Sequence, residues 1–218
     1  MKAKTIYDLF RVAGMTHEGA LAMLGNFAAE STLELIPNIV QIGMTKLTND
    51  QYTAAVDNGL LDFIDSIGYG LAQWTYKTRK AKLLAFAKSK GTSIGDGEMQ
   101  VEFAIKELKE DYHTIWADLC QSHDLFQLTQ LVCNQYENPA VKNVGTRYAY
   151  AQHIEGKLRE KVPVTTPVSQ TFPPNASVKQ IQYVMWDNGY WEIENINGYK
   201  SKEFFDKLRE FVDDMEAC

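Results

Sequence analysis

The order of apolar and polar positions predicts a helix early in the chain. Thr16 is a candidate N-cap, because its hydroxyl can accept a hydrogen bond from the free backbone N–H groups that begin a helix. Apolar residues follow it with the helical period, at Leu21, Leu24 and Ala28. This pattern predicts one helix that starts after Thr16 and ends near Glu30.

The same period predicts four further helices. The first covers residues 78–90 and ends at Gly91, a residue suited to the left-handed C-cap position. Its apolar residues Leu83, Leu84 and Phe86 are expected to face inward. The other three helices are expected near residues 98–112, 124–137 and 146–160.

Residues 37–76 interrupt this helical pattern. They contain Pro37, Asn58, Gly59, Gly68 and Gly70, which favour turns over regular helices. We therefore expect loops and short strands here, lining a cleft. The predicted fold class is mainly α, a helical domain with a small β or loop region beside the cleft.

Proline marks the domain organisation. Four of the six prolines fall in residues 162–177, a segment rich in Thr, Ser and Val and without charge. Such a segment is typical of an extended, semi-rigid linker. It separates a predicted catalytic domain, residues 1–161, from a predicted small helical module, residues 178–218.

Composition and charge narrow the possible functions. With 218 residues and 45% apolar residues, the chain can bury one full core and leave a tail for a small second unit. Its net charge of -6 provides no basic field for nucleic acid. No apolar run approaches the roughly 20 residues of a membrane span, and the N-terminus lacks the apolar core of a signal peptide. We expect a protein made in the cytoplasm that binds no nucleic acid and spans no membrane.

Cysteine and histidine do not indicate a metal or a cofactor. The three cysteines have no metal-ligand spacing, and Cys120 and Cys133 are expected to be reduced core residues. None of the four histidines has a Cys or Asp partner at a recognisable spacing. The sequence therefore predicts no catalytic triad, no metal and no cofactor.

Glu30 is the strongest candidate for chemistry. It follows Phe27 and Ala28 at the expected C-terminus of a helix, where apolar surroundings and the negative end of the helix dipole both disfavour an ionised carboxylate. Hydrolysis of a glycosidic bond needs such a carboxylic acid. A lone glutamate in this position is far more often an exposed residue at a fraying helix end, and spacing alone does not overturn that interpretation.

Three segments together resemble the phage tail lysozyme family of peptidoglycan hydrolases. They are Gly25-Asn-Phe-Ala-Ala-Glu-Ser-Thr32, the loop of residues 50–59, and Asp65-Ser-Ile-Gly-Tyr-Gly-Leu-Ala-Gln-Trp-Thr75. The similarity continues through residues 85–91 and 100–103 to Gln135-Tyr-Glu-Asn-Pro-Ala140. The resemblance implies a lysozyme-like helical fold, peptidoglycan as substrate, and a general acid at Glu30.

The second catalytic carboxylate is assigned to Asp65. Goose-type lysozymes, as distant relatives, place a water-holding Asp at nearly the same offset before their own glycine-rich turn, but the further Asp that follows that turn is replaced here by Thr75. The alternative for Asp65 is a turn-capping residue that bonds the backbone near Ile67. Asp57 and Asp62 are the next candidates.

The glycine-rich turn and the later Tyr-Glu pair supply the expected sugar contacts. Glycines at 68 and 70 permit backbone angles closed to other residues and allow a sugar to approach. The predicted substrate-binding residues are Gln73, Tyr69, Trp74, Thr75, Tyr136 and Glu137. For Trp74 the alternative is a core position, and for Tyr136 and Glu137, which end a helix before Pro139, it is capping of the body.

The tail resembles the small three-helix wall-binding repeats of the CW_7 type found in some phage endolysins. Trp186, Asn188, Gly189 and Tyr199 match that pattern, although the segment between Gly189 and Tyr199 is shorter than usual. The alternative is a structural helical unit that docks on the body.

These features together predict a phage muramidase, an endolysin or tail lysin, that cleaves the β-1,4 bond after N-acetylmuramic acid. It would be made in the host cytoplasm and act on the cell wall after release or as part of a phage particle. A lytic transglycosylase that uses the same Glu is the nearest alternative. A non-catalytic wall-binding or tail structural protein is the alternative from another class.

Overall fold

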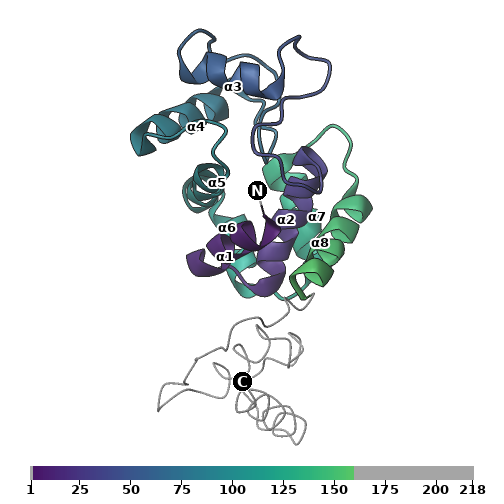
Figure 1. Ribbon diagram of the computed structural model, residues 1–218. Helices are drawn as coiled ribbons and strands as arrows, with labels where there is room; N and C mark the ends of the chain where they lie inside the picture. Colours follow the sequence, from purple (N-terminus) through teal and green to yellow (C-terminus); the bar gives the residue numbers. More distant parts are fainter. Residues whose placement is uncertain (1, 160–218) are drawn as a thin grey trace, which may run out of the picture. The chain divides into compact units, whose positions relative to one another are not determined.

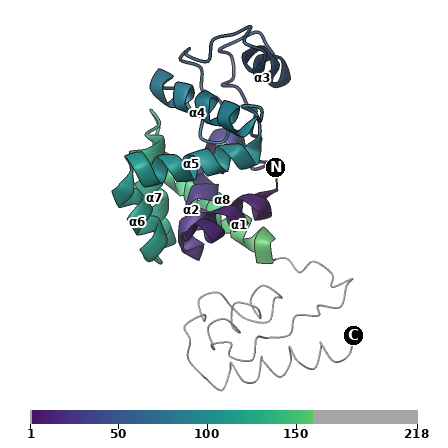
Figure 2. The ribbon, with the colours of Figure 1, turned by 90° about the vertical axis from the view of Figure 1, so that its left-hand side faces the viewer.

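Helix α2 (His17–Ser31) is the centre of the body in the computed structural model, which describes residues 2–159 (Figures 1 and 2). Twelve of its fifteen residues are buried, as expected for a helix that is apolar on every side. It packs against α1, α6, α7 and a π-helical turn, η1. The predicted N-cap is confirmed, because the Thr16 hydroxyl accepts from the Gly19 amide at 3.0 Å.

The remaining helices surround α2 or form the part of the body above it in Figure 1. They are α1 (Ala3–Ala13), α3 (Asn49–Asp57), α4 (Lys77–Lys90), α5 (Gly97–Asp111), α6 (His113–Gln121), α7 (Leu125–Leu131), η1 (Val132–Glu137) and α8 (Val144–Arg159). The mainly helical fold class is thereby confirmed. None of the described helices is long and apolar enough to cross a membrane.

Glycine lets α8 approach the central helix closely. A Cβ atom at Gly25 would lie 2.4 Å from the Arg147 carbonyl oxygen and 2.8 Å from the Ala151 Cβ. The absence of a side chain at Gly25 therefore allows α2 and α8 to pack together. This contact carries Arg147 to the end of α2 at which Glu30 lies.

Residues 37–76 differ in part from their sequence-based prediction. Pairing of extended backbone among the described residues consists of two isolated antiparallel bridges, Val40 to Tyr69 and Tyr69 to Trp74, rather than strands. The segment also contains α3, a helix that the apolar pattern of the sequence does not predict. A capping box starts α3, since the Thr48 hydroxyl accepts from the Gln51 amide and the Gln51 side chain accepts from the Thr48 amide.

The other predicted helices are present with small shifts at their ends. The helix predicted at 78–90 is α4, and Gly91 ends it in the left-handed conformation, with φ of 67°. The one predicted at 124–137 changes from α7 to the π-helical η1 in its second half. Helices α1 and α6 were not predicted. The predicted linker and C-terminal module, with Trp186, Asn188, Gly189 and Tyr199, lie outside the described residues.

Candidate active site

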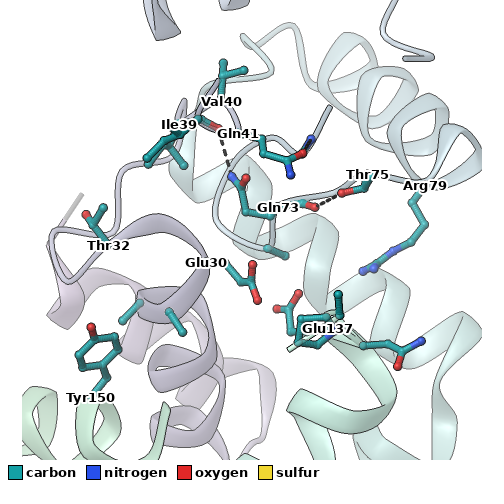
Figure 3. A pocket seen from close by; sticks show the side chains of 18 of the residues that line it. Glu30, Thr32, Ile39, Val40, Gln41, Gln73, Thr75, Arg79, Glu137 and Tyr150 are labelled. Atoms are coloured by element: carbon teal, nitrogen blue, oxygen red, sulfur yellow. Dashed lines mark hydrogen bonds between the residues drawn. The ribbon is translucent and has the colours of Figure 1, made fainter. Parts of the chain in front are cut away.

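Three chain segments meet at a pocket of about 870 Å³ (Figure 3). The C-terminal end of α2 contributes Glu30, the glycine-rich turn contributes Gln73 and Thr75, and the end of η1 contributes Glu137. Figure 3 shows the carboxyl groups of Glu30 and Glu137 pointing toward one another below Gln73. The volume is in the range of pockets that hold small ligands or a few sugar rings.

Glu30 is bound to Arg147 at the bottom of this pocket. The Arg147 guanidinium donates to Glu30 Oε1 at 2.5 Å and to Asn26 Oδ1 at 3.1 Å. Asn26 and Glu30 are four residues apart and therefore lie on the same face of α2. The Gly-Asn-x-x-x-Glu motif thus has a physical account: glycine admits α8, while Asn26 and Glu30 bind the arginine that α8 carries.

Glu137 has a different environment from Glu30. Its Oε1 atom is buried and has no hydrogen-bond partner among the described residues, although the residue as a whole is partly exposed. Burial of the carboxyl group, and next the negative charge of Glu30, raise the pKa of Glu137 well above its ordinary value. The pocket therefore contains one carboxyl in an ion pair and one that favours the protonated form.

Backbone strain is concentrated around the two carboxyls. Thr32, Gln73 and Asn138 all have positive φ, of 71°, 42° and 45°, and all three line the pocket. Thr32 follows the end of α2, and Asn138 follows the end of η1. Non-glycine residues seldom adopt such angles, and strain of this kind is often found at functional sites. A π-helical turn such as η1 is likewise frequent at such sites.

A buried carboxylate on α5 holds the pocket wall in place. Glu107 is 2% exposed and accepts from Trp74 Nε1 at 2.9 Å, from the Tyr136 hydroxyl at 2.9 Å and from two nitrogens of Arg79. Arg79 also donates to the Tyr136 carbonyl oxygen at 3.3 Å. These bonds fix the glycine-rich turn, α4 and the end of η1 relative to one another. Glu137 is the next residue after Tyr136, so its position depends on this network.

The glycine-rich turn is held by two side-chain amides, those of Gln100 and Gln73. Gly70 has φ of 77°, as predicted, and Gln100 occupies the space that a side chain there would need, donating to Pro37 and accepting from the Leu71 amide. Gly68 does not have positive φ; a Cβ there would instead lie 2.8 Å from Gln73 Oε1. The Gln73 amide nitrogen donates to the carbonyl oxygens of Ile39 and Gly70, which fixes its orientation at the pocket wall.

Asp65 does not line the pocket. Its Oδ1 accepts from the Ile67 amide at 2.9 Å and from the fully buried Lys80 ammonium, and its Oδ2 accepts from the Tyr52 hydroxyl at 2.7 Å. Burial opposes ionisation of Asp65, but the hydrogen bonds from Lys80, Tyr52 and Ile67 outweigh it and hold its pKa below the ordinary value. The bond to the Ile67 amide is the one expected from the turn-capping alternative.

The structure brings four of the eight predicted body residues to the pocket. Glu30, Gln73, Thr75 and Glu137 line it, whereas Asp65, Tyr69, Trp74 and Tyr136 do not. The three aromatic side chains among the latter are at most 1% exposed. Their hydroxyl and indole groups are bonded to Thr53 or to Glu107, so they support the wall from behind.

Two functional side chains were missed by the analysis of the sequence. Arg147 is 117 residues from Glu30, and Arg79 is 57 residues from Tyr136, to which it donates at the end of η1; neither arginine belongs to a short motif. A weak signal was the helical spacing of Arg147 from Ala151 and Ile154, which places it on the buried face of its helix. Among residues 2–159, no group of three or more His, Cys, Asp or Glu side chains is arranged to hold a metal ion.

Comparison with known families gives a match over most of the chain. Residues 1–158 match the family model described as phage tail lysozyme, which spans most of the 218-residue chain. The chain belongs to the phage tail lysozyme family. No curated protein matches the sequence. As a phage tail lysozyme, the chain is a lysozyme-like peptidoglycan hydrolase of phage type, and the resemblance stated for its body is confirmed.

Proposed function

We propose that the protein is a muramidase that cleaves the β-1,4 bond between N-acetylmuramic acid and N-acetylglucosamine, with Glu30 as general acid. The observation that carries this proposal is the position of Glu30. It lies at the C-terminal end of the central helix, on a pocket of about 870 Å³ whose opposite wall is the glycine-rich turn. A sugar polymer in this pocket would place a glycosidic oxygen within reach of the carboxyl group.

The reaction also needs a nucleophile. In the muramidase reaction this is a water molecule, and Asp65 is the candidate that the sequence supplies for activating it. Asp65 would have to release the Lys80 and Tyr52 bonds, or act through an intervening group, because its oxygens are occupied and it does not line the pocket.

The environment of Asp65 favours a second candidate reaction, lytic transglycosylation. There the 6-hydroxyl of the muramic residue attacks the anomeric carbon, so no water-activating carboxylate is required. Glu30 would serve as the acid in both reactions. The choice between them depends on the nucleophile and not on the acid.

The proposal is tested by Glu30→Gln. The amide keeps the shape of the side chain but cannot donate the proton, and loss of a general acid typically lowers the rate by about 10² to 10⁴. Clearing of purified cell walls is the measurement. Glu18→Gln is the matched control, because it removes the same charge from the first turn of the same helix.

The outcome of this test separates the enzyme from the non-catalytic alternative. Wall clearing by the Glu30→Gln variant at the parental rate would remove Glu30 from the mechanism. No wall clearing by the parental protein itself would favour a wall-binding or tail structural protein. For an active protein, mass spectrometry of the digest identifies the reaction, since reducing ends and anhydro-muramic ends differ by one water.

Residues 178–218 are proposed as a wall-binding module joined to the catalytic domain by the linker at 162–177. Tethering to a polymer raises the effective concentration of the catalytic domain near its bonds without adding catalytic contacts. A chain that ends at Lys161 should keep its activity on soluble fragments and lose activity on intact walls. Equal loss on both substrates would show that the tail is part of the catalytic fold.

A further inference from the structure

Two carboxyl groups share the pocket, but only one of them has a counter-ion bound to it. Arg147 donates to Glu30 and to Asn26. Arg79 donates to Glu107 and to a backbone carbonyl oxygen. Neither arginine donates to Glu137 Oε1, which is buried and unpaired among the described residues. A buried carboxylate without a donor is costly, whereas a protonated carboxyl avoids most of that cost.

The charged groups that face Glu137 come from four helices. Glu30 on α2 and Glu107 on α5 repel a negative charge there, and Arg79 on α4 and Arg147 on α8 attract one. Tyr136 precedes it on η1 and donates its hydroxyl to Glu107. Both arginines are already neutralised by the glutamates that they contact. Glu30 and Glu107 are paired in the same way, so what distinguishes the site is geometric: the Glu30 carboxyl points toward Glu137 (Figure 3), whose Oε1 has no donor among the described residues.

We infer that Glu30 and Glu137 hold one proton between them, and that Glu137 is the positioning residue that supplies this proton to Glu30 for glycosidic cleavage. This inference rests on the proposed function and deepens it. Before substrate is cleaved, the proton is on Glu137. The pair of carboxyls, and not Glu30 alone, keeps a protonated acid available at neutral pH. Interacting carboxyls of this kind titrate as a unit.

The carboxyl pair gives up one proton and takes up one proton in each reaction cycle. In the resting state Glu30 is ion-paired with Arg147, and the proton is on Glu137. Its transfer to Glu30 leaves Glu137 ionised near Arg79 and Arg147. Glu30 then donates the proton to the glycosidic oxygen, and the bond from that oxygen to the anomeric carbon breaks. The leaving sugar departs with this oxygen as a free hydroxyl group.

The nucleophile restores the starting state. Water or a sugar hydroxyl loses one proton as its oxygen bonds to the anomeric carbon, and this proton returns to the carboxyl pair. The pair therefore holds one proton before and after each turnover. The scheme holds for hydrolysis and for transglycosylation, because both nucleophiles release one proton.

The first test detects the shared proton without measuring activity. Infrared or ¹³C NMR spectra of the full chain labelled at glutamate should show one protonated side-chain carboxyl at neutral pH. This signal should be absent in Glu137→Gln and present in Glu110→Gln, a control at an exposed glutamate paired with Lys106. The absence of a protonated carboxyl in the parental protein, or its persistence in Glu137→Gln, would overturn the inference.

The second test measures the pH dependence of kcat/KM. In Glu137→Gln the carboxyl with the raised pKa is gone, so the pair can no longer hold its proton at neutral pH. The basic limb of the profile should move down by about one to three pH units. Glu137→Asp retains a carboxyl and should leave the limb closer to its parental position, and Glu110→Gln should not move it.

A Glu137 that only packs against its neighbours would change kcat without moving the basic limb, and this result would contradict the inference. Failure of the proposed function gives a different result. In that case Glu30→Gln leaves wall clearing unchanged or no clearing occurs, while the spectroscopic signal of the shared proton is still present. The two proposals can therefore fail independently.

Discussion

The surroundings of Asp65 and of Glu137 differ in how completely each carboxyl is bonded. Each oxygen of Asp65 accepts at least one hydrogen bond, from Tyr52 on one side and from Lys80 and the Ile67 amide on the other. Glu137 Oε1 is buried with no partner among the described residues. The pKa of Asp65 is held low by its donors, which outweigh its burial, while burial and Glu30 raise the pKa of Glu137.

The backbone shows the same contrast. Between Thr48 and Gly68 the one residue with positive φ is a glycine, Gly59. The pocket around Glu137 is lined by three non-glycine residues with positive φ: Thr32, Gln73 and Asn138. A bonded, relaxed environment stabilises a fold, whereas an unbonded and strained one costs stability and is retained where chemistry requires it. The contrast supports a structural role for Asp65 and a place for Glu137 in the proposed site.

The largest expected effect comes from Asp65→Asn. It leaves the Lys80 ammonium buried without a counter-ion, and breaking a buried pair costs about 3 to 5 kcal/mol. We expect a loss of about 3 kcal/mol in the free energy of unfolding, at the lower end of that range, because the Asp65 side chain is 27% exposed. Urea unfolding followed by circular dichroism measures the change.

Asp62→Asn is the matched control for this substitution, since Asp62 is exposed in the same segment. It should change the free energy of unfolding by less than about 0.5 kcal/mol. The activity of the folded fraction decides between the two roles of Asp65. A variant that is as stable as the parental protein but inactive would show that Asp65 acts on the attacking water, and the contrast with Glu137 would fail.

A smaller effect is expected in the pH dependence of stability. The raised pKa of Glu137 in the folded protein means that unfolding releases a proton once the pH exceeds the ordinary carboxyl pKa of about 4.3. Its contribution to stability is complete below that pH and is lost as the pH rises toward the folded pKa. The loss is at most about 1.4 kcal/mol per pH unit.

Glu137→Gln should abolish this component of the pH dependence. The difference in unfolding free energy between the parental protein and the variant should therefore shift in favour of the variant as pH rises from about 4 to neutral. Thermal unfolding at several pH values measures it. Parallel curves for the two proteins would show that Glu137 is ionised in the folded state at neutral pH.

Much of the helical body follows from local signals in the sequence. Thr16 capped the central helix as predicted, and Gly91 ended α4. Helix α3 was missed because its apolar face is short: only Tyr52 and Val56 are buried, between Asn and Asp residues typical of loops. Its Thr48 to Gln51 capping box was the available signal.

The site was less predictable, because its contacts join distant parts of the chain. Glu30 lies in a local motif and lines the pocket, and its catalytic role stays a prediction. The arginine that binds it, Arg147, is 117 residues away, and no periodicity in the sequence encodes that distance. Whether an acid has donors depends on such long-range contacts. Asp65, next to a glycine-rich turn, therefore ranked above Glu137 as a candidate for chemistry, although Glu137 is the one that lines the pocket.

The smallest expected effect concerns the strained backbone that follows Glu30. Thr32 has φ of 71° and ψ of 164°, a region that is almost restricted to glycine. Thr32→Gly should relieve this strain, and after the entropy cost of glycine it should raise the free energy of unfolding by about 1 kcal/mol. Thr92→Gly is the matched control: Thr92 is exposed, follows the C-cap of α4 and is not a positive-φ residue. There, glycine should lower stability by about 0.5 to 1 kcal/mol. The opposite signs would show that strain is stored at the pocket.

If the strain also holds Glu30 in place, Thr32→Gly should lower kcat more than it raises KM, because a less constrained helix end populates the productive orientation of the carboxyl less often. A loss of stability in both variants would mean that the backbone at Thr32 is not strained, and that the contrast between the two carboxyls lies in their hydrogen bonds alone.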